Sequence, residues 1–309
     1  MTPALPAVFV NGVRQPDDAT GISPRDRGLM LGDGLFETMR AHGGTIFKLD
    51  RHLDRLRHGL DVLAIAEPPQ LREWILTAVR AAVDADASIR LAVTRGEGAA
   101  GVPPPSPSRP TVVLVVNPLP SFPAHIYDKG LHASIASGRR NERAMTAGLK
   151  ILAYADAIAA WLEAQRIGQD EALFLDTEGH CSEATSSNLF IVTGGLLITP
   201  PLSCAALPGI TRATVLELAR DLSLEALERP FGEGELIAAD EAFLTSSLRG
   251  IAPLVSLAGT PIGSGTPGAQ TRRIAAAYAE HVAEQCMDAG PATGTGPDKA
   301  RPTMAPSRA

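Results

Sequence analysis

Four short stretches of this chain hold side chains that could do chemistry together. Lys150 opens a segment in which apolar residues recur at three- and four-residue spacing, which predicts a helix beginning at the lysine. Glu183 follows 33 residues later, and residues 207–212 read as a glycine turn that opens another helix. Residues 245–247, Thr-Ser-Ser, follow a predicted apolar strand. An amine, a carboxylate, an anion-binding helix start and a hydroxyl cluster suit covalent catalysis on a phosphorylated ligand.

This combination is what a pyridoxal 5′-phosphate (PLP) site requires. The amine of Lys150 would form the Schiff base, the Glu183 carboxylate would hold the pyridine nitrogen protonated, and amides and hydroxyls would hold the phosphate. Each feature also has a plainer interpretation, because a lysine near a helix start is usually exposed and a glutamate before a Ser/Thr run is usually a turn residue. The hypothesis therefore depends on all four features occurring in this order.

Two further motifs lie in the N-terminal part of the chain. Glycines 32 and 34 suggest a close backbone approach, and residues 36–40 alternate like a strand. Leu49 begins an amphipathic helix on which His52 and Arg55 are three residues apart and project from one face. A guanidinium suits phosphate because it donates hydrogen bonds in a planar fork. The alternative is an exposed basic face of the helix.

Taken in order, these motifs resemble the class IV (fold type IV) PLP-dependent aminotransferases over about residues 7–283. Residues 26–37 match D-R-G-x-x-x-G-D-G-x-F-E, residues 52–56 match His-x-x-Arg-Leu, and residues 183–190 match E-x-x-x-x-N-x-F. The family includes branched-chain aminotransferases, D-amino-acid aminotransferases, (R)-selective amine transaminases and aminodeoxychorismate lyases. The resemblance implies two α/β domains with the PLP cofactor between them.

The resemblance also implies a role for each matching residue, with Lys150 as the catalytic one. The cofactor would be bound by Arg55, Lys150, Glu183, Ser187, Asn188, Leu207, Gly209, Ile210, Thr211, Thr245 and Ser246. The substrate would meet Phe36, Glu37, Arg95, Arg143, Tyr154 and Ser247. Glu178 competes with Glu183 for the pyridine nitrogen, but Glu178 lies in a predicted exposed turn and does not match the motif.

The motifs leave more than one reaction open. The leading prediction is an aminotransferase that moves an amino group between a small-molecule donor and a 2-oxo acid, with D-amino acids or (R)-amines favoured as donors. D-amino-acid aminotransferases hold the carboxylate with an Arg-x-His pair, which the loop at residues 97–110 lacks. The alternatives are a branched-chain L-amino-acid aminotransferase and an aminodeoxychorismate lyase, which forms 4-aminobenzoate and pyruvate. A PLP-binding protein without turnover and an α/β protein without a cofactor are the remaining hypotheses.

The predicted elements indicate an α/β fold of the α+β type, and 309 residues favour two domains. Three prolines in residues 117–123 disfavour a continued strand or helix, which places the interdomain linker at 121–123. The small domain is expected at 1–120, the large domain at 124–286 and a disordered tail at 287–309. A helix is also predicted over residues 68–86, and a basic loop over 137–143.

The composition limits which classes of partner and which cellular compartment are expected. A net charge of −6 and a pI near 5.7 argue against nucleic acid as a partner, and the chain has no run of eighteen apolar residues that would span a membrane. The first residues lack the charged and apolar blocks of a signal peptide. Three cysteines show neither a disulfide framework nor metal-binding spacing, so no metal site is predicted. A cytoplasmic protein is the simplest interpretation, and the resemblance implies a homodimer.

Overall fold

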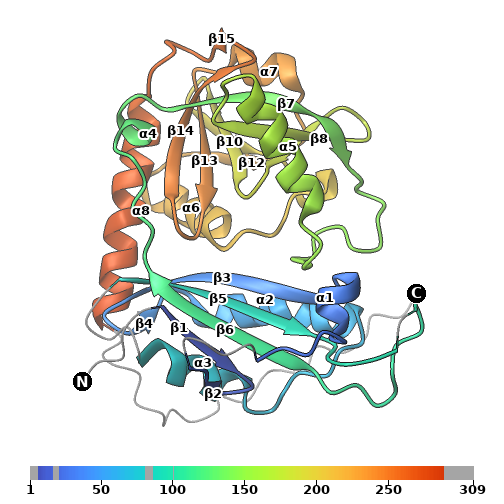
Figure 1. Ribbon diagram of the computed structural model, residues 1–309. Helices are drawn as coiled ribbons and strands as arrows, with labels where there is room; N and C mark the ends of the chain where they lie inside the picture. The colour runs from blue at the N-terminus through green and yellow to red at the C-terminus, as the bar shows by residue number, and fades with distance from the viewer. Residues whose placement is uncertain (1–5, 17–20, 81–85, 100, 289–309) are drawn as a thin grey trace, which may run out of the picture.

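The computed structural model describes residues 6–16, 21–80, 86–99 and 101–288. They form two α/β domains, stacked one above the other in Figure 1, and each domain has its own sheet. The chain leaves the small domain after β6 (Thr111–Pro118) and enters the large domain at α4 (His125–Asp128). The predicted linker at 121–123 lies between these two elements. The predicted α/β class is confirmed.

The small domain is built on a six-stranded sheet in the order β2-β1-β6-β5-β3-β4, with neighbouring strands antiparallel. Its other strands are β1 (Ala7–Val10), β2 (Val13–Arg14), β3 (Gly34–His42), β4 (Thr45–Ile46) and β5 (Ala87–Thr94). Its helices are α1 (Arg27–Leu31), α2 (Leu49–Val62) and α3 (Leu71–Val79). The predicted Asn-Gly turn joins β1 to β2, and both of its residues have the positive φ that such a turn requires.

The two-residue period of β3 and β5 divides their side chains between two faces. Leu35 and Met39 belong to the buried core that the leucines of α2 complete. Phe36, Thr38 and Arg90 stand on the opposite face and line a cavity against the large domain. Alternation along a strand therefore assigns one set of residues to the core of the small domain and the other to the interdomain cavity.

The large domain is built on a nine-stranded mixed sheet in the order β12-β11-β10-β13-β14-β7-β8-β9, with β15 beside β14. Because β9 pairs with both β8 and β10, six of these strands close into a ring: β10, β13, β14, β7, β8 and β9. The strands are β7 (Leu131–Arg140), β8 (Glu171–Asp176), β9 (Cys181–Ala184), β10 (Asn188–Thr193), β11 (Leu196–Thr199), β12 (Ala226–Glu228), β13 (Glu241–Ser246), β14 (Gly250–Leu257) and β15 (Thr260–Pro261).

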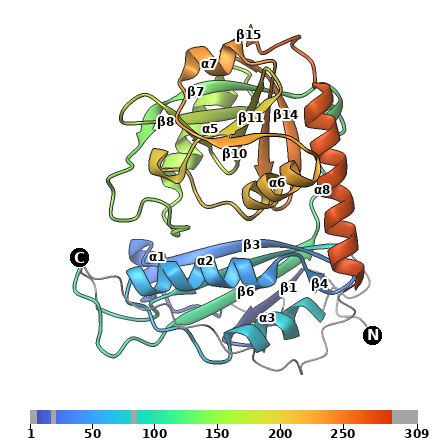
Figure 2. The same ribbon diagram turned by 180° about the vertical axis from the view of Figure 1, so that it is seen from behind.

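Helices cover this sheet and connect the domains. The helical elements are α5 (Ala155–Arg166), η2 (Leu202–Cys204), α6 (Ile210–Asp221), α7 (Glu233–Ala238) and α8 (Ala269–Asp288). Helix α8 packs on β13 and β14 and reaches β3 and β4 of the small domain, so it runs along one edge of both domains (Figure 2). Within the described residues, no helix is both long and apolar enough to cross a membrane.

Three element boundaries differ from the sequence expectation. Helix α3 covers Leu71–Val79, which is part of the predicted span 68–86. Strand β7 continues to Arg140, so the first residues of the predicted basic loop are paired with β8. Helix α8 extends to Asp288, and the rest of the predicted tail lies outside the described residues.

Candidate active site

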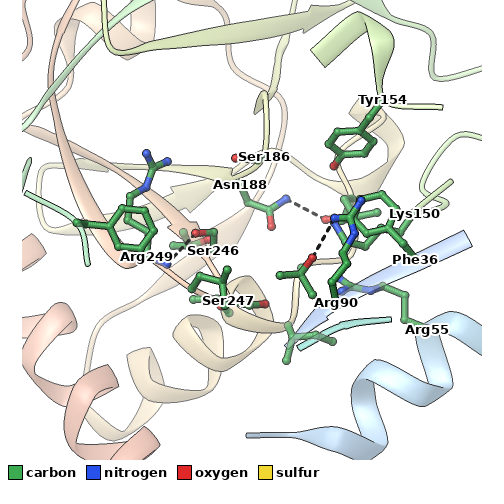
Figure 3. Close-up of a pocket in the computed structure, with 18 residues that line it drawn as sticks. Phe36, Arg55, Arg90, Lys150, Tyr154, Ser186, Asn188, Ser246, Ser247 and Arg249 are labelled. Carbon is green, nitrogen blue, oxygen red and sulfur yellow. Dashed lines mark hydrogen bonds between the residues drawn. The ribbon is translucent and has the colours of Figure 1, made fainter. Parts of the chain in front are cut away.

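A cavity of about 240 Å³ lies between the two domains. One wall comes from β3, β5 and α2 of the small domain, and the other comes from the large domain, where the start of β10, the end of β13, the start of α6 and neighbouring loops contribute (Figure 3). The lining residues are Phe36, Thr38, Arg55, Arg90, Phe122, Lys150, Tyr154, Ser186, Asn188, Leu207, Gly209, Ile210, Thr211, Thr245, Ser246, Ser247, Leu248 and Arg249. The structure therefore brings together Lys150, the start of α6 and the Thr-Ser-Ser cluster, which are far apart in the sequence.

Lys150 does not begin a helix, contrary to the sequence prediction. The backbone around it is extended, because Phe36 N donates to Lys150 O at 2.9 Å and Leu152 N donates to Gly34 O at 3.0 Å. Helix α5 begins only at Ala155. Hydrogen bonds to a strand of the other domain thus outweigh the local helical pattern, and they fix the lysine at the domain boundary.

The Lys150 amine lies in an apolar, cationic part of the cavity. Its Nζ is 4.3 Å from the ring centroid of Phe36 and 5.5 Å from that of Tyr154. Burial lowers the pKa of Lys150 to about 8, and the positive charge of Arg55 acts in the same direction. A pKa of about 8 leaves a larger neutral fraction of this amine near neutral pH than an ordinary lysine has, and the neutral amine is the nucleophilic and basic form.

Arg55 is held by a buried carboxylate on the neighbouring strand. Its Nε donates to Glu37 Oε1 at 2.8 Å and its Nη2 to Glu37 Oε2 at 2.6 Å, while Nη1 donates to Pro208 O at 2.8 Å. His52 Nδ1 lies 2.7 Å from Glu37 Oε2. The fork of Arg55 is therefore fixed before any ligand arrives, with its charge at the edge of the cavity.

Glu37 is therefore not a cavity residue, although the resemblance implied contact with substrate. Its side chain is 1% exposed and points away from the cavity lining, toward Arg55 and His52. Burial alone would raise the pKa of Glu37, but hydrogen bonds from Arg55 and His52 outweigh it and hold the pKa at about 2. Burial lowers the pKa of His52, so the imidazole stays neutral at neutral pH.

The start of α6 and the end of strand β13 form one corner of the cavity. Gly209 precedes α6 and offers no side chain to the first-turn amides, which leaves them available for an anion. A Cβ at Gly209 would lie 1.9 Å from Asn188 Oδ1, so a larger residue would displace the Asn188 side chain from its hydrogen bond to Leu207 O. Thr245 Oγ1, at the end of β13, is buried without a hydrogen-bond partner among the described residues. Because Thr245 also lines the cavity, this hydroxyl is free to hydrogen-bond to a polar group of a ligand there.

Glu183 lies behind this corner, at a second cavity of about 200 Å³ that shares Tyr154 and Leu207 with the first. Leu207 N donates to Glu183 Oε2 at 2.9 Å, and Arg140 Nη2 lies 3.2 Å from Glu183 Oε1. Burial raises the pKa of the Glu183 carboxyl, although Arg140 and the Leu207 amide act against it. Asn188 Nδ2 donates to Leu207 O at 2.9 Å and fixes the same loop from the other side.

The other residues implied for cofactor and substrate fall into two groups. Phe36, Tyr154 and Ser247 line the cavity, together with Asn188, Leu207, Ile210, Thr211 and Ser246. Ser187 does not: it is buried behind the wall, where its Oγ accepts a hydrogen bond from Arg249 Nη2 at 2.9 Å, and its neighbour Ser186 lines the cavity instead.

Arg95 and Arg143 lie outside the cavity, which corrects their implied contact with substrate. Arg95 donates to both carboxylate oxygens of Asp33, at 2.8 and 3.0 Å, and to the carbonyls of Leu63 and Ala64. Its guanidinium is thus saturated by structural contacts within the small domain. The Arg143 side chain is 81% exposed and lies 3.6 Å from Glu142.

Two cavity arginines were not found from the sequence. Arg90 lies over the Phe36 ring at 3.4 Å from its centroid and donates to Thr38 Oγ1 at 3.2 Å. Arg249 pairs with the buried Glu171 at 3.3 Å. The alternation of β5 was the available signal for Arg90, because Arg90 and Ser88 share the face opposite the core. Arg249 gave no comparable signal.

The chain belongs to the class IV aminotransferase family, whose model matches residues 34–257. It is 35% identical over 271 residues to a putative branched-chain-amino-acid aminotransferase of Methanocaldococcus jannaschii, covering 86% of this chain and 93% of that protein. The structure of 4-amino-4-deoxychorismate lyase from Pseudomonas aeruginosa superposes with a TM-score of 0.79 at 35% identity, covering 88% of this chain and 98% of that one.

The structure of a T.th. branched-chain amino acid aminotransferase with pyridoxamine 5′-phosphate is also similar, with a TM-score of 0.84, 28% identity and 92% and 96% of the two chains covered. The predicted family, the transaminase assignment and the type IV fold are thereby confirmed.

Proposed function

We propose that the interdomain cavity binds PLP and that the protein transfers amino groups between apolar amino acids and 2-oxo acids. The observation that carries the proposal is the buried Lys150 amine, which faces the same cavity as the open start of α6. The Thr245 hydroxyl, which has no hydrogen-bond partner among the described residues, and the close backbone corner at Gly209 fit a phosphate there, and Arg55 adds a fixed positive charge. Glu183 lines the adjoining second cavity, which shares Tyr154 and Leu207 with the first, and would pair with a protonated pyridine nitrogen. PLP, when bound, supplies the electron-accepting ring that transamination needs.

The chain's own residues supply binding, orientation and proton transfer. Arg55, the α6 amides and Thr245 would hold the phosphate and so set the tilt of the ring. Lys150 would hold the cofactor covalently and, once released, take and return the substrate proton as a neutral amine. The negative charge of Glu183 would keep the pyridine nitrogen of the cofactor protonated. The Leu207 amide and Arg140 hold the Glu183 carboxylate in position.

Arg90 supports a substrate that carries a carboxylate. Its guanidinium projects into the cavity, and it donates a hydrogen bond to the neutral hydroxyl of Thr38 rather than to an acid. Phe36, Phe122 and Leu248 give the rest of this wall an apolar character. A cation next to an apolar surface suits the carboxylate and the side chain of an apolar amino acid. The names of the similar proteins favour a branched-chain L-amino acid as the donor.

Two other assignments have specific support and serve as outcomes of the test. The 35% identity to a 4-amino-4-deoxychorismate lyase supports release of pyruvate from an aminodeoxychorismate. A D-amino-acid or (R)-amine donor remains the prediction from sequence, but the similar proteins reported above have branched-chain or lyase names. The cytoplasmic location also stays a prediction; Cys181, Cys204 and Cys286 are free and buried, which is compatible with a reducing compartment.

The test is a substrate panel on the purified enzyme with added PLP. L-Leucine, D-alanine, (R)-1-phenylethylamine and aminodeoxychorismate are each assayed with 2-oxoglutarate or pyruvate, and L-leucine with 2-oxoglutarate should react fastest. Borohydride reduction should attach the cofactor to the peptide that contains Lys150, which mass spectrometry detects. Attachment at another lysine, or none, contradicts the PLP assignment. Fastest turnover of aminodeoxychorismate without a 2-oxo acid makes the protein a lyase.

Two arginine variants distinguish an effect on substrate recognition from an effect on folding. Arg90→Ala should lower kcat/KM for L-leucine by roughly tenfold to a hundredfold, because one charge-assisted contact is lost. The matched control Arg143→Ala removes an exposed arginine and should leave the rate unchanged. (R)-1-Phenylethylamine has no carboxylate, so its turnover, if any, should not depend on Arg90.

A further inference from the structure

Three different metal-binding side chains meet beside the β8–β9 hairpin, outside both cavities described above. A ligand atom from each of Asp176, His180 and Cys204 lies within 4.8 Å of the other two. Asp176 and Cys204 are buried, whereas the His180 side chain is 35% exposed and opens the cluster to solvent. Asp176 and His180 flank a hairpin turn and Cys204 ends η2, so the cluster forms only on folding and the cysteine spacing could not predict it.

The geometry already resembles one side of a coordination shell. Asp176 Oδ1 accepts from Glu178 N at 3.0 Å and His180 N at 2.8 Å, which fixes the carboxylate. Its other oxygen, Oδ2, faces His180 Nδ1 at 3.2 Å. Tetrahedral zinc bound at about 2.0–2.3 Å sets its ligand atoms roughly 3.3–3.8 Å apart. The Asp–His pair therefore needs little movement, and Glu178 Oε2, 3.8 Å from His180 Nδ1, offers a further oxygen.

The donor set and its surroundings select the kind of ion. Imidazole nitrogen and thiolate sulfur favour zinc-type ions over magnesium or calcium, which prefer oxygen ligands. Cys204 is buried beside Asp176, with which its thiol interacts through a side-chain hydrogen bond, and the negative charges of Asp176, Glu178 and Glu142 act on it. A divalent cation would offset this concentration of negative charge and favour the thiolate.

We propose that Asp176, His180 and Cys204 bind a divalent transition-metal ion of the zinc type. On binding, the thiol of Cys204 releases its proton to solvent, and the ion bonds to sulfur, nitrogen and oxygen. The ion fastens η2 to the hairpin, directly before the loop 205–209. In that loop, Leu207 N donates a hydrogen bond to Glu183, and Pro208 O accepts one from Arg55. The ion thus stabilises the loop from which the active site is built, without itself touching the cavity.

The test uses the full-length enzyme stripped with a chelator and titrated with Co²⁺, whose spectrum reports its ligands. One Co²⁺ per chain should bind, with the near-ultraviolet charge-transfer band of a cobalt–thiolate bond, and Zn²⁺ should displace it. Cys204→Ser should abolish this band. His180→Gln should keep the band but weaken binding on the order of a hundredfold, because one of three ligands is lost. Cys286→Ser, a buried cysteine on α8, is the matched control and should bind as the wild type does.

Thermal unfolding completes the test. Zn²⁺ should raise the melting temperature of the wild type and of Cys286→Ser, and it should have no effect on His180→Gln at the same concentration. Because His180 is partly exposed, this variant keeps its fold even if Cys204→Ser does not. No uptake of Co²⁺ by the wild type, or equal binding by His180→Gln, overturns the proposal and leaves a hydrogen-bonded cluster. Because cofactor and turnover play no part in these readouts, the outcome is independent of the proposed function.

Discussion

At the residue scale, the environment of Lys150 matters more than the lysine itself. Other lysines of the described chain are on the surface or near helix starts, but Lys150 is half-buried, with its amine beside two aromatic rings and near the charge of Arg55. These neighbours favour the neutral amine, which is the reactive form. The same burial means that the protonated amine destabilises the folded state, so the free energy of unfolding depends measurably on pH.

Replacing Lys150 by Met should abolish turnover and stabilise the cofactor-free protein at pH 7. The folded pKa of about 8 lies below the ordinary 10.5, so the unfolded chain binds more protons between these values. The destabilisation of the folded state by the protonated Lys150 amine is complete below pH 8 and is lost as the pH rises to 10.5. It is at most about 3 kcal/mol, reduced by water in the cavity.

Urea unfolding of Lys150→Met and wild type at pH 7 and pH 10.5 measures this difference. Lys129→Met, at an exposed lysine, is the control, and it should change the free energy of unfolding by a small and equal amount at both pH values. A stability difference for Lys150→Met that does not shrink at high pH contradicts the lowered pKa.

Glu183→Gln should keep PLP bound but slow proton abstraction by roughly tenfold to a hundredfold. The amide has nearly the same shape but cannot provide the charge that holds a pyridine proton, and one charge-assisted hydrogen bond is worth about 1.5–3 kcal/mol. Glu178→Gln changes a side chain that is 61% exposed and should leave the rate unaltered. Single-turnover rates of the two variants decide between the two glutamates, and a slow Glu178→Gln would show that the motif was misplaced.

The sequence motifs located cavity residues that belong to short contiguous motifs. They missed cavity residues whose partners lie on a neighbouring strand. Lys150, Arg55, Gly209 and Thr245 reach the cavity as expected. Arg90 was missed because a single arginine in a strand resembles an ordinary exposed residue until its cross-strand partner Thr38 is known. The roles of the located residues stay predictions until the variants are measured.

At the element scale, contacts between elements overrule local pattern at two places. Residues 150–152 read as helix but pair with β3, because backbone hydrogen bonds at the domain boundary are satisfied there. In α5 the large apolar residues Ile158 and Leu162 stay 58% and 41% exposed. The structure buries the smaller Ala160 and Ala164 against β7 and β8 instead, because the helix lies close to the sheet.

Strand β3 and helix α2 are joined at Glu37, and Glu37→Gln should weaken both the fold and the Arg55 anchor. The folded pKa of about 2 lies below the ordinary 4.5, so the charged carboxylate contributes stability above pH 4.5 that is lost as the pH falls through 2. The variant should lose roughly 3 kcal/mol at pH 7 because a buried charge partner is removed, and it should bind PLP more weakly.

Urea unfolding and PLP titration at pH 7 measure the two effects of Glu37→Gln. Glu67→Gln removes the carboxylate that pairs with Arg57 on the surface and should cost less than about 1 kcal/mol. Equal losses in the two variants would mean that Glu37 does not hold Arg55.

At the scale of the whole molecule, the two-domain architecture was predicted from the sequence and its family resemblance, but the outer surface was not. The side chains of Ile158, Trp161 and Leu162 on α5 are 58%, 43% and 41% exposed, and Met145 is 95% exposed. Leu29 on α1 of the small domain is 70% exposed. Helix α5, segment 141–149 and α1 lie toward the same side of the molecule in Figures 1 and 2. Exposed apolar residues thus occur on elements of both domains that lie toward this side, and such residues are candidates for a contact with a partner.

The homodimer implied by the family resemblance provides such a partner. We expect wild-type protein to sediment as a dimer, because a second copy would cover the large apolar side chains of α5. Trp161→Glu should shift the equilibrium to monomer, since it places a charge within an apolar contact. Val13→Glu changes a side chain that is 64% exposed on β2 and should leave the dimer intact. A wild-type monomer in sedimentation at a concentration that shows full activity would contradict the dimer, and dissociation of both variants would place the contact elsewhere.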